Sequence, residues 1–280
     1  MTQIRPEDRV AYLGPEGTYS HAAMLKYFGS SQVAVPVDEI PNVFQSVASG
    51  DCVYGLVPVE NSSEGSVTQT LDCFGQHSLQ IVGEVMLRIE HCLLASKATQ
   101  ASGIFRIVSH QQSLGQCRHW LASHYPDVDK ISLFSNAEAA RSAANQSGIA
   151  AIAGRSAAAI YGLDILEENI EDVHDNTTRF AVLCQDHVPV PTGKDKSSLI
   201  LAIRNEPGAL FDALEAFKIH AVNLIKLESR PSRKEAWSYS FFVDIDGHRD
   251  DANIRAALAE VDKHVLECRV LGSYPAARTE

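Results

Sequence analysis

The sequence lacks several features by which common classes of protein are recognised. No apolar run among its 280 residues approaches the length needed to cross a bilayer, and the polar segment 1–9 lacks the apolar core of a secretory signal. None of the six cysteines forms a C-x-x-C pair, and the 11 histidines show no H-E-x-x-H spacing. These absences predict a cytoplasmic protein without a zinc motif, in which Cys92 and Cys184 serve as small buried apolar residues.

The chain also lacks basic charge. Its 24 Lys and Arg residues against 35 Asp and Glu residues leave a formal net charge of −11. This balance disfavours a nucleic-acid partner, because phosphate binding needs a basic surface. An anionic ligand would have to be held by local donors, such as helix N-termini and single arginines. The nucleotide-binding P-loop is absent too, since segment 14–20 lacks the G-K-[ST] ending, and no G-x-S-x-G nucleophile elbow occurs.

The first two thirds of the chain alternate short apolar runs with helical stretches. Strands are expected at 10–13, 33–37, 54–59, 105–108, 131–134, 149–153 and 179–184, and helices at 20–28, 43–48, 67–74 and 114–124. A further helix is expected between Ser135, which has capping-box spacing with Glu138, and Gly148 at the C′ position. Such alternation predicts βαβ crossovers and a mainly parallel sheet covered by helices. A long apolar run near 83–95 and a return segment at 163–183 would give two α/β lobes, the second at about 84–162, with a cleft between them.

The rest of the chain has a different rhythm. Segment 188–197 combines two prolines, a glycine and charges, and is expected to be a linker. After it, strands are expected at 198–203, 223–227, 239–245 and 266–271, and helices at 209–217 and 254–261. This β-α-β-β-α-β order is that of a ferredoxin-like domain, which we expect to span 198–275.

Five polar clusters adjoin the expected strands of the first part. They are Gly14-Pro-Glu-Gly-Thr-Tyr-Ser20, Glu60-Asn-Ser-Ser-Glu-Gly65, Ser109-His-Gln-Gln-Ser113, Gly154-Arg-Ser156 and Asp175-Asn-Thr-Thr-Arg-Phe180. The first four follow a strand and precede a helix, where open parallel sheets bind ligands and helix N-termini offer N–H groups to anions. Together they indicate a pocket for a small acid. Taken singly, each has a simpler explanation: a tight turn at Gly14, a helix cap at Thr18, or a structural ion pair at Arg179.

The order of these motifs resembles the prephenate dehydratase family. The matching motifs are G-P-x-G-T-Y-S, P-V-E-N-S, S-H-x-Q and N-T-T-R-F, and the resemblance runs from about Arg9 to Asp186. Beyond the linker, Pro207-Gly-Ala-Leu210 and Glu228-Ser-Arg-Pro231 resemble the two signatures of an ACT regulatory domain. The resemblance implies a two-lobed catalytic domain like a type 2 periplasmic binding protein at 8–187, followed by the ACT domain.

The family also implies a function. A carbon–oxygen lyase would convert prephenate to phenylpyruvate with loss of CO2 and water, in L-phenylalanine biosynthesis. It would use no metal or organic cofactor, act as a homodimer or homotetramer, and bind phenylalanine as an effector at a subunit interface of the ACT domain.

The resemblance assigns roles by motif position. Thr178 would donate a hydrogen bond to the departing hydroxyl, with Glu60 and His110 as candidates for the proton transfer; Glu60 could equally lock the two lobes together. Substrate contacts are expected from Thr18, Asn61, Ser62, Ser109, Thr177, Arg179 and Phe180. Effector contacts are expected from Gly208, Ala209, Leu210, Asn223, Leu224, Glu228, Ser229, Arg230 and Pro231.

Two departures and three alternatives accompany this interpretation. Gln111 stands where the family often has proline, which would loosen the loop that holds His110. Only nine residues precede the first expected strand, too few for the chorismate mutase domain of many relatives, so we expect a monofunctional enzyme or a fragment of a longer one. The alternatives are an arogenate dehydratase, a non-enzymatic protein that binds small acids, and a regulatory sensor with an inactive catalytic part.

Overall fold

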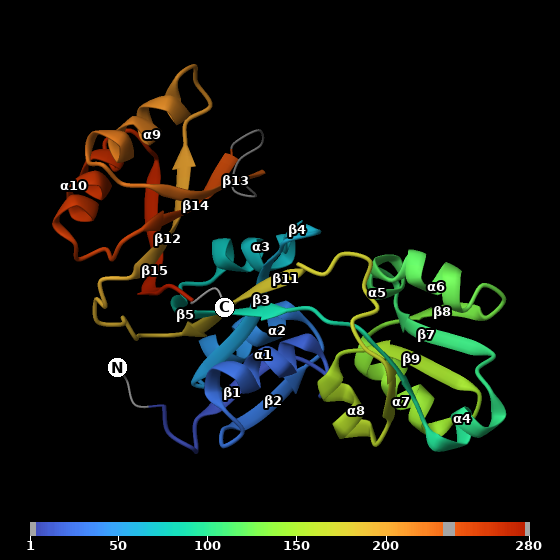
Figure 1. The fold of residues 1–280 in the computed structure, drawn as a ribbon. Helices are drawn as coiled ribbons and strands as arrows, with labels where there is room; N and C mark the ends of the chain where they lie inside the picture. Colours follow the sequence, from blue (N-terminus) through green and yellow to red (C-terminus); the bar gives the residue numbers. More distant parts are fainter. Residues whose placement is uncertain (1–3, 232–238, 278–280) are drawn as a thin grey trace.

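Three β-sheets organise the chain in the computed structural model, which describes residues 4–231 and 239–277 (Figure 1). Two sheets form the cores of two α/β lobes, and the third belongs to a C-terminal domain that lies against the first lobe in Figure 1. The arrangement agrees with the expected fold class: a two-lobed, periplasmic-binding-protein-like α/β domain followed by a ferredoxin-like domain.

The first lobe contains both ends of the two-lobed domain. Its strands are β1 (Arg9–Leu13), β2 (Val33–Val37), β3 (Tyr54–Asn61), β4 (Gly65–Ser66), β5 (Gln80–Arg88) and β11 (Thr177–Cys184), and its helices are α1 (Tyr19–Phe28), α2 (Ile40–Ala48) and α3 (Thr68–Gln76). The sheet order is β2-β1-β3-β11-β5, with β4 beside β3. The first helix starts where the Thr18 hydroxyl accepts a hydrogen bond from the His21 N–H, and it buries Ala23, Met24 and Phe28.

The second lobe is inserted between β5 and β11. Its strands are β6 (Cys92–Ala95), β7 (Arg106–His110), β8 (Asp129–Leu133), β9 (Ile149–Ala153) and β10 (Asp164–Glu167), and its helices are α4 (Lys97–Ser102), α5 (Gln111–Gln116), α6 (Arg118–His124), α7 (Asn136–Asn145) and α8 (Arg155–Tyr161). The sheet order is β10-β6-β9-β7-β8. Three of the five residues of β9 are alanines and all five are buried, which allows helices to pack closely on this strand.

The expected lobe boundaries and strand directions need correction. The second sheet runs from Cys92 to Glu167 rather than over 84–162, because β5 continues to Arg88 while paired with β11 in the first sheet. The sheets are also mixed rather than mainly parallel. β11 runs antiparallel to β3 and β5, and β6 runs antiparallel to β9 and β10, since the chain enters and leaves the second lobe through these strands.

The C-terminal domain has the expected β-α-β-β-α-β order. Its elements are β12 (Asp195–Ile203), α9 (Ala209–Ile219), β13 (Leu224–Pro231), β14 (Tyr239–Asp246), α10 (Ala252–Val261) and β15 (Glu267–Pro275), and its sheet order is β13-β14-β12-β15. The strand β12 begins inside the segment expected to be a linker, because residues from Asp195 onward already pair with β15 and, from Lys196, with β14.

One face of this third sheet packs on its own helices, and the other packs on the first lobe. Ile200, Phe242, Leu271 and Tyr274 join the hydrophobic core that contains the buried side chains of α2 and α3. The approach is close: a Cβ atom added to Gly272 on β15 would lie 2.0 Å from the Ile81 carbonyl oxygen on β5. The C-terminal domain is therefore held directly against the sheet that carries β3 and β11.

Candidate active site

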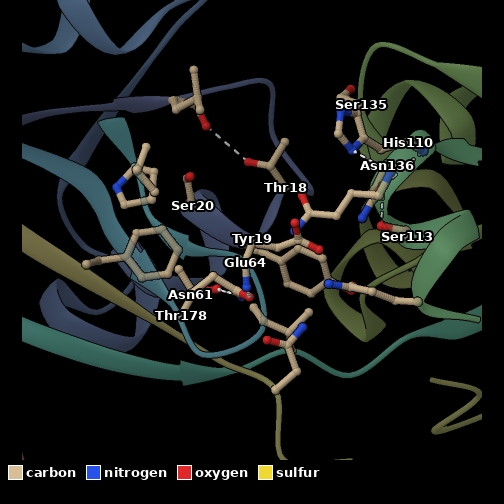
Figure 2. A pocket seen from close by; sticks show the side chains of 18 of the residues that line it. Thr18, Tyr19, Ser20, Asn61, Glu64, His110, Ser113, Ser135, Asn136 and Thr178 are labelled. Carbon is tan, nitrogen blue, oxygen red and sulfur yellow. Dashed lines mark hydrogen bonds between the residues drawn. The ribbon is translucent and has the colours of Figure 1, made fainter. Parts of the chain in front are cut away.

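A cavity of about 490 Å³ lies between the two lobes (Figure 2). It sits beyond the carboxyl ends of β1, β3 and β7, where open α/β sheets bind their ligands. The first lobe contributes Thr18, Ser20, Asn61, Glu64, Thr178 and Phe180, and the second contributes His110, Gln112, Ser113, Phe134, Ser135 and Asn136. Four of the five sequence clusters thus contribute to one cavity: those at 14–20, 60–65, 109–113 and 175–180.

A hydrogen bond between Asn61 and Thr178 joins the two central strands at the cavity. The Asn61 Nδ2 donates to Thr178 Oγ1 at 2.8 Å, and both side chains are buried. The Asn61 amide is fixed in this orientation, because its Oδ1 accepts the backbone N–H groups of Ser63 and Glu64 at 3.0 and 3.1 Å. Since an amide NH2 group cannot accept, Thr178 must keep its own proton for another acceptor. The pair therefore presents an oriented hydroxyl donor to the cavity.

The opposite wall is organised by Asn136, which the sequence interpretation missed. Its Oδ1 lies 3.1 Å from Ser113 Oγ and 3.2 Å from Ser109 Oγ, and accepts the backbone N–H of His110 at 3.2 Å. Asn136 is the first residue of α7, directly after the helix cap Ser135. The N-cap signal located this helix start, but nothing in the local pattern indicated that the asparagine side chain would turn toward the neighbouring strand.

His110 lines the cavity as expected. It caps α5, and its Nδ1 accepts the backbone N–H of Gln112 at 3.3 Å. With Nδ1 used as an acceptor, the neutral imidazole carries its proton on Nε2. Neighbouring Ser109 does not reach the cavity: it is fully buried, and its hydroxyl lies 2.6 Å from the Ile152 carbonyl. The expected substrate contact from Ser109 is therefore wrong, because this residue ties β7 to β9 below the cavity wall.

Two further expected contacts lie beside the cavity rather than in it. Ser62 and Thr177 are not among the lining residues; instead the Ser62 Oγ accepts the Thr177 N–H at 2.9 Å, and the Ser62 N–H donates to the Thr177 carbonyl at 2.9 Å. These bonds fasten the end of β3 to the start of β11. Both residues fix the strand ends that carry Asn61 and Thr178.

Arg179 and Glu60 point away from the cavity. The Arg179 guanidinium is buried and contacts Glu84 at 2.7 Å, Asp244 at 2.5 Å and the Tyr274 hydroxyl at 2.8 Å. The Glu60 carboxylate lies 3.0 Å from the Lys226 ammonium of the C-terminal domain. Because successive residues of a strand face opposite sides, side chains next to Asn61 and Thr178 must leave on the far face of the sheet. The expected substrate contact of Arg179 and the chemical role of Glu60 are corrected accordingly.

The two crossovers between the lobes are bonded to each other. The Ile89 N–H donates to the Asn176 carbonyl at 2.8 Å, and the Ile170 N–H donates to the His91 carbonyl at 3.0 Å. A side-chain bond adds to these: the buried Glu171 carboxylate accepts the His91 N–H at 2.8 Å. The lobes thus meet through a paired, two-stranded connection.

His91 also links the two lobes through its ring. Its Nδ1 lies 2.7 Å from the Tyr19 hydroxyl of the first lobe, and its Nε2 lies 2.8 Å from the Gln116 Oε1 of the second. Burial lowers the pKa of the His91 imidazole, and the smaller opposing effects of Gln116 and Glu171 do not restore it. His91 is therefore neutral in the native protein at neutral pH.

This burial predicts a loss of stability in mild acid. The pKa of His91 in the folded protein lies below its usual value of about 6.5. Below that pH the unfolded chain therefore takes up a proton before the folded protein does. The free energy of unfolding then falls as the pH is lowered, by at most about 1.4 kcal/mol per pH unit for one proton. Burial lowers the pKa of His21 as well and acts in the same direction. Thermal unfolding between pH 8 and pH 5 should show His91→Gln with a flatter decline than the wild type. An unchanged decline in His91→Gln, matching the exposed-site control His124→Gln, would contradict this account.

Comparison with known proteins agrees with this geometry. A family model described as prephenate dehydratase matches residues 10–188, more than half of the chain, and one described as ACT domain matches residues 197–263. The chain belongs to the prephenate dehydratase family. The fold class expected from the sequence is thereby confirmed.

Individual relatives extend the match over nearly the whole chain. A bifunctional chorismate mutase/prephenate dehydratase of Pseudomonas aeruginosa is 48% identical over 96% of this chain and 73% of its own length. A crystal structure of a prephenate dehydratase from Arthrobacter aurescens in complex with L-Phe has a TM-score of 0.88 at 33% identity, over 96% of this chain and 90% of that one. A structure of GqqA, described as a novel type of quorum quenching acylase, has a TM-score of 0.87 at 29% identity, over 96% and 98%.

The ACT domain of this family member has a cavity of its own, of about 370 Å³. Gly208, Ala209 and Leu210 line it at the start of α9, as expected for an effector site, together with Tyr239 and Phe241 of β14. The remaining expected effector residues do not line this cavity. They lie on or beside the edge strand β13: Asn223, Leu224, Glu228, Ser229, Arg230 and Pro231.

Two of these edge-strand residues have polar partners within the chain. The Asn223 Nδ2 donates to Asp246 at 2.7 Å, and the Arg230 guanidinium lies 3.0 Å from Asp72 on α3.

Over the described residues, no group of three or more His, Cys, Asp or Glu side chains could hold a metal ion. In the same part of the chain, none of the helices combines the length and apolar character that a membrane crossing requires.

Proposed function

We propose that this protein is a prephenate dehydratase, a lyase that removes CO2 and the ring hydroxyl of prephenate to give phenylpyruvate. The observation that carries the proposal is the hydrogen bond from Asn61 to Thr178 in the cavity between the lobes. It leaves the Thr178 hydroxyl as a donor, as needed to stabilise an oxygen on which negative charge develops. Membership of the prephenate dehydratase family, over nearly the whole chain, supports the same reaction.

The reaction needs little more than correct positioning, because aromatisation drives it. The bond between the ring and its carboxylate breaks, and its electron pair enters the ring. The carbon–oxygen bond opposite then breaks, and the departing oxygen takes up a proton to leave as water. In this site Thr178 donates a hydrogen bond to that oxygen, and His110 on the opposite wall is the candidate for the proton transfer, in which its imidazolium form would give up a proton and return to the neutral ring.

The cavity offers a bound dicarboxylate neutral hydrogen-bond donors but no cationic side chain among the described residues. Among the described residues that line it there is no lysine or arginine, and Asp38 and Glu64 are acidic. The substrate would be held by neutral donors, including the N-termini of α1 and α7, which start at Thr18 and Ser135 on the cavity wall. A ring carboxylate without a cationic partner is poorly stabilised, which favours its departure as CO2.

Phe134 supplies apolar surface at the same cavity. It is 94% exposed although it lines the cavity, an unusual position for a large aromatic side chain. Its neighbour Ser135 begins α7, so the ring is carried by a fixed helix start rather than by a long loop. Closure of the lobes over a bound ring would remove this surface from water.

A turnover assay tests the proposal. The purified protein should convert prephenate to phenylpyruvate, which is detected by its ultraviolet absorbance in alkali. Arogenate, assayed side by side, tests the alternative substrate, and binding of prephenate without turnover would favour the non-enzymatic alternatives.

An acylase activity like that of the GqqA relative has less support, because the hydrogen bonds of Thr178 and Ser113 run to the amides of Asn61 and Asn136 rather than to a histidine base.

Feedback regulation by phenylalanine is part of the proposal. The relative from Arthrobacter aurescens was crystallised in complex with L-Phe, and the present chain has an ACT domain. The cavity at Gly208 adjoins β13 within one chain, because Tyr239 and Phe241 of its lining are paired in register with Pro231 and Ser229. We expect the effector to bind there, at a subunit interface of a homodimer or homotetramer. Gly208→Val, strained because Gly208 has φ of 88°, and Asn223→Ala should weaken inhibition by phenylalanine and spare the uninhibited rate. Unchanged inhibition in both would move the effector site elsewhere.

A further inference from the structure

The central strands of the first lobe carry two residue pairs back to back. In the register of β3 and β11, Asn61 is paired with Thr178, and Glu60 is paired with Arg179. The Asn61–Thr178 pair faces the cavity. Since strand residues alternate between faces, the Glu60–Arg179 pair points toward the ACT domain. The charged pair and the cavity pair are therefore formed by neighbouring residues of the same two strands.

The ACT domain presents a matching pair. Lys226 on β13 and Asp244 on β14 are paired in register within its sheet. Lys226 lies 3.0 Å from Glu60, and Asp244 lies 2.5 Å from Arg179. Two ion pairs thus join one cross-strand pair of each domain, and we refer to Glu60, Arg179, Lys226 and Asp244 as the four-charge clamp.

The contacts around the clamp restrict its movement. Arg179 also bonds Glu84 and Tyr274, and the Ser198 hydroxyl donates to Asp244 at 2.5 Å. Little of the Arg179 and Asp244 side chains is exposed, and charge-assisted hydrogen bonds in such surroundings depend strongly on geometry. On the other side of the clamp, the Lys226 ammonium also donates to Ser66 on β4, at 2.8 Å. A shift of β13 or β14 would therefore pull on β3, β4 and β11 rather than slide past them.

The strands are irregular beside the clamp in both domains. The register of β11 with β3 shifts between Arg179 and Phe180, and that of β13 with β14 shifts between Leu224 and Lys226. Such bulges re-aim side chains and interrupt regular pairing. One irregularity therefore adjoins Arg179 in the first lobe and the other adjoins Lys226 in the ACT domain, and the backbone can adjust locally at both places.

From this arrangement we propose that the four-charge clamp lets the ACT domain position the Asn61–Thr178 pair. Glu60 and Arg179 act as positioning residues, and an effector that displaces β13 or β14 withdraws the Thr178 hydroxyl from its place in the cavity. The inference rests on the proposed prephenate dehydratase activity. An effector can shift the equilibrium between an active and an inhibited conformation only through contacts that differ between these two conformations.

Steady-state kinetics of clamp variants tests the proposal. Lys226→Met and Glu60→Gln each remove one charge from the partly accessible half of the clamp, and the exchange Glu60→Lys with Lys226→Glu restores the attraction in reverse. Arg269→Met is the matched control. Arg269 also reaches from the ACT domain to the first lobe, where it bonds the carbonyls of Phe74 and His77, and neither of these bonds involves β3 or β11. Each protein is assayed for kcat and KM on prephenate, with and without saturating phenylalanine.

If the clamp positions the Asn61–Thr178 pair, both single variants should resemble the inhibited enzyme. Their kcat should fall at least about fivefold, the lower range of typical coupling between sites, with KM nearly unchanged and little further loss on adding phenylalanine. The exchange should regain part of both kcat and inhibition, and Arg269→Met should keep both. If the single variants melt at a lower temperature but keep the kcat and the inhibition of the wild type, the contacts only fasten the domains and the proposal is overturned. A wild type that does not turn over prephenate would instead defeat the proposed function.

Discussion

Replacing Thr178 by valine is expected to lower kcat for prephenate by about 100- to 1000-fold, the usual effect of removing one aimed hydrogen-bond donor from a transition state. Valine has nearly the shape of threonine and fits the same buried position beside Asn61. The change removes the hydroxyl that Asn61 leaves free to donate. KM should change much less, because the donor matters most when charge has developed on the departing oxygen.

The matched control is Thr178→Ser, which keeps the hydroxyl and removes only a methyl group. It should retain most of the activity, and the melting temperatures of both variants should stay near that of the wild type. Loss of one buried partner leaves the Asn61 amide short of an acceptor, so a small destabilisation of Thr178→Val is expected. Wild-type kcat in Thr178→Val would contradict the assigned role.

Replacing Arg179 by methionine is expected to lower the free energy of unfolding by about 3–5 kcal/mol, the usual result of removing one partner from a buried ion pair. The substitution leaves the carboxylates of Glu84 and Asp244 buried on either side of the lost guanidinium. Lys196, 2.9 Å from Glu84, compensates for only part of this charge. Urea unfolding at neutral pH measures the change.

A charge-matched variant separates this effect from simple loss of packing. Arg179→Met combined with Glu84→Gln and Asp244→Asn removes the buried charges together, and should recover much of the lost stability, since apolar or neutral replacements of whole buried ion networks are often tolerated. If Arg179→Met instead unfolds like the wild type and only raises KM for prephenate, the residue contacts the substrate and the corrected assignment is wrong.

The contrast between Thr178 and Arg179 shows how far sequence reasoning reaches. The N-T-T-R-F motif places Thr178 and Arg179 at the start of the strand expected at 179–184, whereas β11 begins at Thr177. Because successive residues of a strand face opposite sides, only one of the two side chains enters the cavity. Which face belongs to the cavity depends on the pairing of β11 with β3, 117 positions apart at the Asn61–Thr178 bond. Local patterns carry no such long-range register, and the motif by itself therefore assigns Arg179 to the substrate contacts.

The same reason explains the other differences. The helix starts at Thr18 and Ser135 follow from short-range capping signals, and the structure has both. The antiparallel placement of β11, the lobe boundary after β5 and the turn of Asn136 toward Ser109 and Ser113 all arise from contacts between distant segments. The ion pair of Glu60 with Lys226 joins two domains, and neither sequence neighbourhood indicates the other.

The direction of the Thr178 hydroxyl is the central claim, and Asn61→Asp tests it most directly. An aspartate keeps the shape of the side chain and can still accept the N–H groups of Ser63 and Glu64 through one oxygen. Its second oxygen replaces the donor with an acceptor, which turns the Thr178 proton away from the cavity. At saturating prephenate, kcat of Asn61→Asp is predicted to fall about 100-fold or more, with no further loss on adding Thr178→Val. A kcat close to that of the wild type would contradict the account.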